Sequence, residues 1–234
     1  MEEERIAISA DRVVYANSTE ALYQQKIKKL SYSIVKRSFD VVFGITGCLF
    51  LVPLTAAVKL AYLASGDTAP IFYKHKRVGK DGKVFELYKY RSMIPNADKI
   101  LADLLANNRE LSDEWGQYQK LENDPRITKV GKILRKLSLD EMPQVFNILR
   151  NDMSLIGPRP LTIGELDEHG GNHSIYESVK PGISGWWAAN GRSDVSFHER
   201  LQLEYFYAKN ASVLLDLKCI WLTILTVLAR KGAK

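Results

Sequence analysis

VVFGITGCLFLVPLTAAV, residues 41–58, is a run of eighteen residues without a charge. As an α-helix it would be roughly 27 Å long, at ~1.5 Å per residue, which is the lower limit for crossing the apolar core of a bilayer. Pro53 lies inside the run, and a proline removes a backbone hydrogen bond and kinks or breaks a helix. The run therefore predicts a membrane helix interrupted at Pro53, and a helix buried in a protein core stays the alternative.

Basic residues flank this run on both sides. They are Lys26, Lys28, Lys29, Lys36 and Arg37 before it, and Lys59, Lys74, Lys76 and Arg77 after it. Cytoplasmic flanks of membrane segments are rich in Lys and Arg, so both flanks are expected on the same side. A helix that enters the membrane, breaks at Pro53 and returns satisfies both, provided that its freed backbone groups find partners. We therefore predict a re-entrant membrane helix over about residues 36–64 rather than a single span.

The overall composition is that of an ordinary globular domain. Of 234 residues, 46% are hydrophobic and 26% are charged, which excludes a disordered or fibrous chain. The mean hydropathy of −0.18 argues against several membrane spans. Lys and Arg number 33 and Asp and Glu 27, giving a formal charge of +6. This balance favours an acidic partner: a nucleic acid, an anionic lipid or a phosphorylated substrate.

The chain is predicted to form an N-terminal arm, residues 1–31, and a single domain, residues 32–234. The arm has no clear periodicity, and at most one short helix is expected in it. Its start lacks the apolar core of a signal peptide, so no cleavable signal is expected. Cys48 and Cys219 have no histidine at metal-ligand spacing, which argues against a disulfide framework and a structural zinc site.

A basic β-hairpin is predicted over residues 71–91. Two β-rich runs flank Asp81-Gly82, which is a strong turn signal. The segment holds seven Lys or Arg and two acids, so one of its faces is cationic. Such a face beside a membrane segment suits anionic lipid headgroups or a phosphate, and a merely solvated charged hairpin is the alternative.

The most informative acidic residues are Asp140 and Glu141. Ser138 and Glu141 have the spacing of a capping box, which predicts a helix that starts at Ser138. Two carboxylates at a helix N-terminus suit a divalent cation or nucleophilic attack. On the plainer alternative they only favour the start of the helix.

A rigid arginine follows this helix. Pro158 and Pro160 stiffen the backbone on both sides of Arg159, and an arginine on a preorganised loop suits bidentate phosphate binding. Arg135 and Lys136 precede the acidic pair, defined as Asp140 and Glu141. The acids, the bases and the rigid arginine together predict a site for a Mg²⁺-phosphate substrate.

Several motifs in order carry a resemblance to a known family. They are Lys36-Arg37-x-Phe39-Asp40; Arg77-x-Gly79-x-x-Gly82-Lys83-x-Phe85 with Lys89-x-Arg91-Ser92-Met93; K-x-S-L-D-E-x-P-Q at 136–144; D-M-S-L-I-G-P-R-P at 152–160; and Lys180-Pro181-Gly182-Ile183-Ser184-Gly185 with Gly191-Arg192. Over about residues 34–232 the chain resembles the bacterial sugar transferases, which are monotopic polyprenyl-phosphate sugar-1-phosphate transferases (phosphoglycosyl transferases). It is similar to their short form, which consists of the catalytic domain alone.

The resemblance implies transfer of a sugar 1-phosphate from a UDP-sugar to undecaprenyl phosphate, with release of UMP. It implies that Asp140 is the nucleophile and forms a phosphosugar-enzyme intermediate, and that Glu141 helps to organise Mg²⁺, the implied cofactor. We expect the helix N-terminus and nearby Arg135 to keep Asp140 ionised. The resemblance further implies phosphate or substrate contacts; their candidates are Arg135, Arg159, Lys89, Arg91 and Arg192, with Asp152 as an organising residue at the end of the helix.

Two positions depart from the family pattern. Asn151 stands where the family usually has glycine, and asparagine is the next-best residue for a left-handed turn, so the turn is expected to survive. Ala188 stands where the family has glutamine. This substitution puts the nucleotide or sugar specificity in doubt, but not the phosphate chemistry.

The C-terminal third is predicted to be helical. A capping box at Ser196 opens a helix to about Ala208, and a second helix begins at Ser212. This second helix carries only Asp216 and Lys218 as charges, so it suits either the membrane interface or the domain core. The expected fold is thus α+β: a mostly helical monotopic membrane domain with a Pro-broken re-entrant helix, a basic β-hairpin and interfacial amphipathic helices.

The implied location is the cytoplasmic face of the bacterial inner membrane. The implied partners are a UDP-sugar, undecaprenyl phosphate and inner-membrane lipids, and the pathway class is exopolysaccharide, capsule or O-antigen (lipopolysaccharide) synthesis. The sequence does not name the sugar, although galactose or glucose is preferred, and a homodimer stays open. The alternative function is a basic adaptor without catalysis that binds the membrane or a nucleic acid. No nucleic-acid motif is present, so a nucleic-acid partner is not expected.

Overall fold

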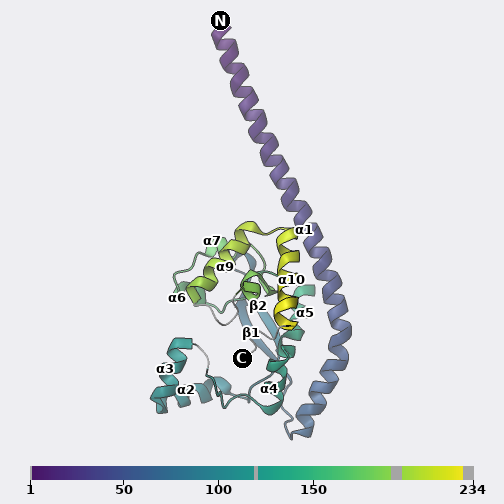
Figure 1. Ribbon diagram of the computed structural model, residues 1–234, viewed down its shortest axis with the longest axis vertical. Coiled ribbons are helices and arrows are strands. Elements are labelled where there is room, and N and C mark those ends of the chain that lie inside the picture. The colour runs from purple at the N-terminus through teal and green to yellow at the C-terminus, as the bar shows by residue number, and fades with distance from the viewer. Residues whose placement is uncertain (1, 119–120, 191–196, 229–234) are drawn as a thin grey trace.

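A long helix, α1 (Glu2–Ala64), dominates the computed structural model, which describes residues 2–118, 121–190 and 197–228. In Figure 1 the N-terminal part of α1 projects away from the rest of the chain, and its second half curves along one side of the domain. The predicted arm is therefore not a loose segment with one short helix, because residues 2–31 continue directly into the apolar run.

The predicted break at Pro53 is not present in this structure. Pro53 lies inside α1, and the chain stays helical to Ala64 instead of reversing. Residues on both sides of the proline are buried in one core cluster: Leu51 before it and Val58 and Tyr62 after it. Pro53 costs the helix a backbone hydrogen bond. The packing of the buried side chains before and after it outweighs this loss and keeps α1 in one helix.

Two glycines allow α1 to pack closely on α5 (Val145–Leu149). A Cβ on Gly44 would lie 2.6 Å from a methyl carbon of Leu149, and a Cβ on Gly47 would lie 2.7 Å from a methyl carbon of Val145. Any larger residue at these positions would force the helices apart. The apolar run is thus covered by protein on one face.

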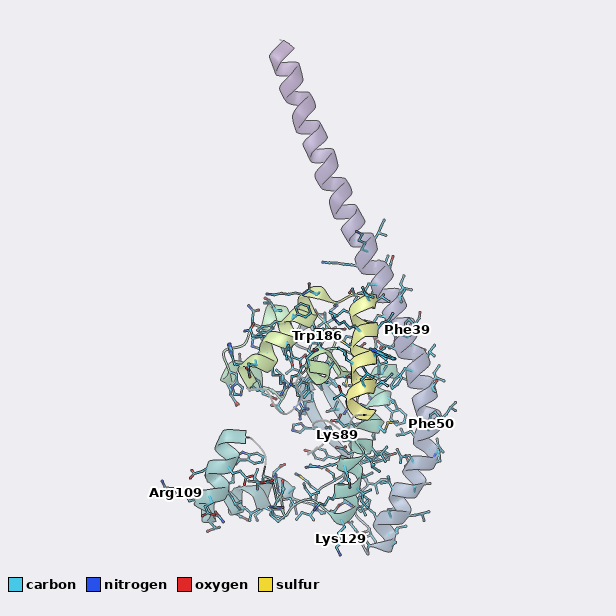
Figure 2. All side chains as sticks on the ribbon, in the orientation of Figure 1. Phe39, Phe50, Lys89, Arg109, Lys129 and Trp186 are labelled. Carbon is cyan, nitrogen blue, oxygen red and sulfur yellow. The ribbon has the colours of Figure 1, made fainter. Side chains whose placement is uncertain are left out.

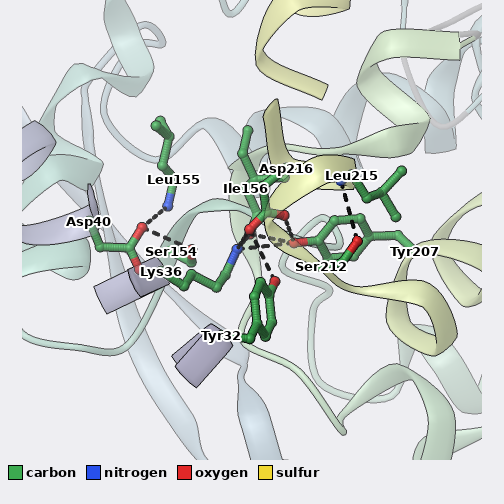
Figure 3. A network of polar contacts seen from close by, with 10 residues as sticks. All are labelled: Tyr32, Lys36, Asp40, Ser154, Leu155, Ile156, Tyr207, Ser212, Leu215 and Asp216. Atoms are coloured by element: carbon green, nitrogen blue, oxygen red, sulfur yellow. Dashed lines mark hydrogen bonds and ion pairs between the residues drawn. The ribbon is translucent and has the colours of Figure 1, made fainter. Parts of the chain in front are cut away.

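A polar cluster near the start of the apolar run joins α1 to α10 (Val213–Leu228). The Lys36 ammonium donates to Asp216 Oδ2 at 2.8 Å, to the Tyr207 hydroxyl at 3.0 Å and to the Ile156 carbonyl at 2.9 Å. Tyr32 and Tyr207 donate to the two oxygens of Asp216 at 3.0 and 2.5 Å. Figure 3 shows these residues converging on one point; we call them the anchor network.

The next turns of α1 fix two further segments. The Arg37 guanidinium donates to the carbonyls of Ile148 and Leu149 at 2.7 and 2.9 Å, at the C-terminal end of α5. Asp40 is 3% exposed and accepts from the Ser154 hydroxyl at 2.9 Å and from the next main-chain amide at 2.8 Å. The first motif of the sequence therefore attaches the apolar helix to the domain.

The strands form two small sheets. The first is the predicted basic hairpin: β1 (Phe72–Val78) pairs antiparallel with β2 (Val84–Tyr90), in a register that runs from Phe72↔Tyr90 to Val78↔Val84. The turn between them contains η1 (Lys80–Gly82), where Asp81 and Gly82 have φ angles of 57° and 71°. In the second sheet, β3 (Ser154–Ile156) pairs parallel with β4 (Gly182–Ser184).

The other helices pack around these sheets. They are α2 (Ala97–Asn107), α3 (Arg109–Tyr118), α4 (Lys129–Lys136), the 3₁₀ helix η2 (Leu139–Gln144), α6 (Glu165–Glu168), α7 (His173–Tyr176), α8 (Trp186–Asn190) and α9 (Phe197–Asn210). In Figure 1, α10 lies beside α1, whereas α6, α7 and α9 lie on the side of the domain away from α1. The predicted mostly helical α+β fold is confirmed.

The outward faces of α1 and α10 are apolar. Their exposed large side chains, which we call the apolar surface, are Leu30, Ile34, Phe39, Val42, Ile45, Leu49, Phe50, Val52 and Leu60 on α1, and Leu214, Leu217, Trp221 and Ile224 on α10. Figure 2 labels Phe39 and Phe50 along α1. By length and composition Lys26–Ala64 could cross a membrane, and 22% of its most apolar window is buried inside the protein.

Candidate active site

The acidic pair lies in η2, the 3₁₀ helix between α4 and α5. The predicted capping box is wrong: Ser138 has a left-handed conformation, with φ of 54°, and its side chain makes no capping hydrogen bond. Only Leu137 and Ser138 separate α4 from η2, so the chain must turn sharply at Ser138 and its hydroxyl does not reach the amides that follow. The acids therefore stand on a tight turn rather than at the start of a regular α-helix.

The two carboxylates of the pair have different surroundings. Glu141 Oε1 accepts from the Lys89 ammonium on β2 at 2.7 Å, and both side chains are mostly buried. Among the residues whose side chains the structure describes (26–116, 121–190 and 197–226), Asp140 has no ion-pair partner. The structure therefore brings Lys89, a predicted phosphate ligand, directly to the pair, but only to one of its members.

Their pKa values shift in opposite directions. Burial raises the pKa of Asp140; the Lys89 charge opposes this shift and the neighbouring Glu141 adds to it. Burial alone would also raise the pKa of Glu141, but the charge and hydrogen bond of Lys89, helped by the Arg159 charge, lower it overall. Arg135 lowers the pKa of Asp140 as expected, but the cost of burial outweighs it, so the net shift of this pKa is upward. Opposite shifts in adjacent acids are typical of catalytic sites.

Arg135 and Arg91 are bound to other parts of the protein. Arg135 Nε donates to the Ser92 hydroxyl at 2.9 Å. Arg91 is 8% exposed, and its guanidinium donates to Asp67 at 2.9 Å, to the Pro70 carbonyl at 2.7 Å and to a further main-chain carbonyl. These contacts do not support the prediction that Arg91 binds a phosphate, because its donors are already used to fold the segment around it.

Arg159 lies on a loop that is held at both of its main-chain groups. Its amide donates to Glu204 Oε1 at 3.0 Å, and its carbonyl accepts from the Tyr176 hydroxyl at 2.7 Å. The guanidinium stands over the Trp187 ring, with Cζ 5.8 Å from the ring centroid. The loop is thus fixed by long-range hydrogen bonds as well as by its prolines. The positive charge of Arg159 contributes to lowering the pKa of Glu141.

Asp152 follows α5 and contacts Asn147 on that helix. Its carboxylate is 3.5 Å from the amide nitrogen of Asn147, a fully buried residue whose side chain bonds the backbone of β2 on both its oxygen and its nitrogen. Asp152 thus contacts the support of β2 rather than Lys89 or the pair itself. Asn151 has φ of 71°, so the left-handed turn expected at this position is present. Arg192, a predicted substrate ligand, lies outside the described residues.

Two further arginines lie beside Arg159 and were not among the predicted site residues. Arg77 on β1 donates to the Pro160 carbonyl at 3.3 Å, and Arg200 on α9 stands 4.6 Å from the Trp187 centroid. Arg77 belongs to the basic hairpin and to a quoted motif, which was a usable signal. Arg200 lies in a helix without a recognisable motif, and only the fold brings it to this place.

The described residues contain no group of three or more His, Cys, Asp or Glu side chains that could hold a metal ion. The acidic pair supplies two carboxylates, one of them engaged by Lys89. Mg²⁺ usually binds proteins through one or two carboxylates and completes its shell with water and substrate phosphates. The pair therefore fits a cation that arrives with a diphosphate, and it does not fit a closed metal cage.

Comparison with known proteins identifies the family of this chain. The family model described as bacterial sugar transferase matches residues 31–230, so the chain belongs to the bacterial sugar transferase family. It is 42% identical over 210 residues to the undecaprenyl-phosphate galactose phosphotransferase of Salmonella typhimurium, covering 90% of this chain and 44% of that protein. It is 40% identical over 200 residues to the exopolysaccharide production protein ExoY of Sinorhizobium fredii, covering 86% of this chain and 88% of that protein.

A third relative is the galactosyl transferase CpsE of Streptococcus agalactiae, 40% identical over 213 residues, or 91% of this chain and 46% of CpsE. The chain thus spans less than half of the Salmonella and Streptococcus relatives and most of ExoY.

Proposed function

We propose that the protein transfers a sugar 1-phosphate from a UDP-sugar to undecaprenyl phosphate and releases UMP. The observation that carries this proposal is the asymmetric acidic pair: Glu141 is engaged by Lys89, while the half-buried Asp140 beside it has no ion-pair partner in the described parts of the chain. A basic adaptor without catalysis would have no use for a carboxylate buried at this cost, and the named relatives are transferases.

Asp140 is the proposed nucleophile. Its carboxylate oxygen attacks the β-phosphorus of the UDP-sugar, and the bond from that phosphorus to the bridging oxygen breaks, so UMP leaves with the electron pair. An oxygen of the lipid phosphate then attacks the same phosphorus and releases the Asp140 carboxylate. The product is an undecaprenyl diphosphate sugar. Two displacements at one phosphorus require a nucleophile that is not held in an ion pair, which matches Asp140 and not Glu141.

Lys89 and Arg159 are proposed to hold the phosphates around this nucleophile. Lys89 neutralises Glu141 and offsets part of the burial cost of Asp140. Glu141 and Asp140 would hold Mg²⁺, and when bound the ion would neutralise charge on the diphosphate. Arg159, on its fixed loop, is suited to bidentate contact with a phosphate oxygen pair.

The apolar surface is proposed to lie in the membrane interface, with the domain on the cytoplasmic side. One face of the apolar run is packed on α5 and on the core through Gly44, Gly47 and Leu51, so lipid cannot surround this helix on all sides. Its other face is exposed and apolar. Partial immersion, in which α1 does not cross the bilayer, satisfies both faces and keeps both basic flanks on one side.

This topology is tested with introduced cysteines at positions 30 and 80 in cells. Both are expected to be inaccessible to a membrane-impermeant thiol reagent applied from the periplasm. Labelling of only one of them from that side would contradict the one-sided arrangement.

The proposed donor is UDP-galactose, and the proposed pathway class is exopolysaccharide or capsule synthesis. Two of the relatives carry galactose in their names and a third is an exopolysaccharide production protein. Ala188, the departure from the family pattern, lies in α8 and follows Trp187 in the sequence. A panel of UDP-sugars with undecaprenyl phosphate, read by UMP release, measures the preference.

The mechanism is tested by trapping the intermediate. The full chain in detergent is incubated with radiolabelled UDP-galactose and Mg²⁺ without lipid acceptor, and we expect a phosphosugar adduct that Asp140→Asn abolishes. Asp113→Asn, an exposed change on α3, is the matched control and should label normally. An undiminished adduct in Asp140→Asn would contradict the mechanism, and absence of UMP release with every sugar tested would contradict the function.

A further inference from the structure

Three arginines from distant parts of the sequence lie near one another, and two of them contact Trp187. Arg159 and Arg200 stand over its ring, with Cζ 5.8 and 4.6 Å from the centroid. Arg77 reaches the same loop from β1, where its Nη1 is 3.3 Å from the Pro160 carbonyl. We call Arg77, Arg159 and Arg200 the arginine cluster.

Several donors of this cluster are buried and unused. Arg77 Nε, Arg200 Nε and Nη2, and Trp187 Nε1 are shielded from solvent and have no hydrogen-bond partner within the described residues. A buried charged donor without a partner is costly, and folded proteins contain few of them. Four such donors in one place indicate that an acceptor with several oxygens belongs between them.

The acids beside the cluster are Glu165, whose Oε2 is engaged, and Glu204, whose Oε2 is buried without a hydrogen-bond partner among the described residues. Glu165 Oε2 accepts from both the amide and the hydroxyl of Thr162 at 2.8 Å, and it stands 3.7 Å from Arg77 Nη1. Glu204 accepts from the Arg159 amide through Oε1, and burial raises its pKa to about 7, so at neutral pH it carries only part of a charge. Glu165 and Glu204 together thus supply fewer than two full negative charges to the three guanidinium groups.

The arginines also disfavour one another. Burial lowers the pKa of Arg77 and of Arg200, and in both cases the nearby charge of Arg159 lowers it further. Cations held together in a low-dielectric place store electrostatic energy that an anion would release. A dianionic phosphate group supplies both the charge and the hydrogen-bond acceptors.

We propose that the arginine cluster, with the Trp187 indole N–H, binds the phosphate of the nucleotide that leaves as UMP. The inference rests on the proposed function and adds Arg77, Arg200 and Trp187 to its substrate contacts. Arg159 links the two parts of the site, since its charge reaches Glu141 of the acidic pair. A diphosphate with its β-phosphorus at Asp140 would therefore extend its other phosphate toward the cluster.

The position of the cluster favours the nucleotide over the lipid phosphate. Arg200 comes from α9, and the partner of Arg77, Glu165, from α6; both helices lie on the side of the domain away from α1 and its apolar surface. A lipid phosphate enters from the membrane side, whereas a water-soluble nucleotide enters from this one. During the reaction, negative charge grows on the oxygen that leaves with UMP, and fixed guanidinium donors stabilise it there.

The test measures binding of UMP, uridine and inorganic phosphate to the full chain in detergent by calorimetry. Arg77→Gln and Arg200→Gln are each expected to weaken UMP binding tenfold or more and to leave uridine binding unchanged. Trp187→Phe keeps the ring and removes one donor, so we expect a smaller loss. Arg109→Gln, an exposed change on α3 that Figure 2 labels on the ribbon, is the control and should bind UMP normally.

UMP affinity that stays at the unmodified level in both arginine variants would overturn the inference. So would a raised KM for undecaprenyl phosphate with unchanged UMP binding, since this would assign the cluster to the lipid. If Arg200→Gln does not fold, Arg77→Gln and Trp187→Phe decide. UMP binding does not depend on turnover, so loss of the proposed activity and loss of this subsite are separate results.

Discussion

The anchor network and the arginine cluster both take charged side chains out of water, but they complete their contacts to different degrees. In the anchor network the Lys36 ammonium has three acceptors within 3.0 Å, and both oxygens of Asp216 are used. In the arginine cluster three guanidinium nitrogens have no partner within the described residues. Saturated buried charges hold the fold, whereas unsaturated ones are available to a ligand.

The anchor network should be the more sensitive of the two to loss of a partner. Lys36→Met is expected to lower the free energy of unfolding by about 3–5 kcal/mol, because it leaves the buried Asp216 carboxylate without its cation. Denaturant unfolding in detergent measures the change. The double variant Lys36→Met with Asp216→Leu should recover part of the loss, and a single variant as stable as the unmodified chain would remove the distinction between the two clusters.

Glu204 offers a test of the arginine cluster by pH. Its pKa is about 7 in the folded chain, above the ordinary value of 4.5. Between these values the unfolded chain has released the proton and the folded chain still holds it, so stability falls as the pH rises through this window. Glu204→Gln should remove this loss of stability, which amounts to about 2 kcal/mol between pH 5 and pH 8. The glutamine side-chain oxygen can still accept the hydrogen bond from the Arg159 amide.

The measurement is the free energy of unfolding at pH 5 and at pH 8, for the unmodified protein and for Glu204→Gln. Glu110→Gln, an exposed change on α3, should keep the pH dependence of the unmodified chain. A Glu204→Gln variant with the same pH dependence would show that Glu204 titrates near its ordinary pKa.

The smallest stability effect is expected within the cluster itself. Arg200→Gln loses a ring contact at Trp187 but also removes a cation whose Nε and Nη2 have no partner in the described chain. We expect the free energy of unfolding to change by less than about 1 kcal/mol. Thermal unfolding without phosphate measures the change in stability, and thermal unfolding with phosphate measures binding. Phosphate should stabilise the unmodified chain and not the variant. A loss as large as that of Lys36→Met would make Arg200 part of the fold.

Local turn chemistry and rigid loops were predictable from sequence. Asp81 and Gly82 have the positive φ angles that the hairpin requires, and Asn151 has the left-handed conformation expected in place of glycine. The motif order also identified the family and predicted that Asp140, Glu141 and Lys89 share one site, and the structure brings Lys89 into contact with Glu141. In each case the signal is short in sequence, or it is a set of residues that a single reaction requires.

Features set by distant contacts were not predictable in this way. Packing on both sides of Pro53 keeps α1 helical where the local rule expects a break. The pKa of Asp140 depends on how deeply η2 is buried, and the local pattern of a helix N-terminus gave the opposite sign. Arg91 and Arg200 show the same limit, because the fold alone decides that one arginine is saturated and the other is not.

The contacts of Gly44 and Gly47 with α5 also fix the position of the acidic pair along the axis of α1. Gly44 and Gly47 follow Asp40 by four and seven residues, so the three lie on one face of α1. This face contacts β3 through Asp40 and α5 through the two glycines. Because α5 follows η2 without a break, the acidic pair cannot slide along α1. A single inserted residue between Asp40 and Gly44 would rotate everything after it by about 100° and lose the match. In the proposed arrangement, with the apolar surface in lipid, α1 would hold the proposed nucleophile Asp140 at one depth, within reach of phosphates at the level of the headgroups.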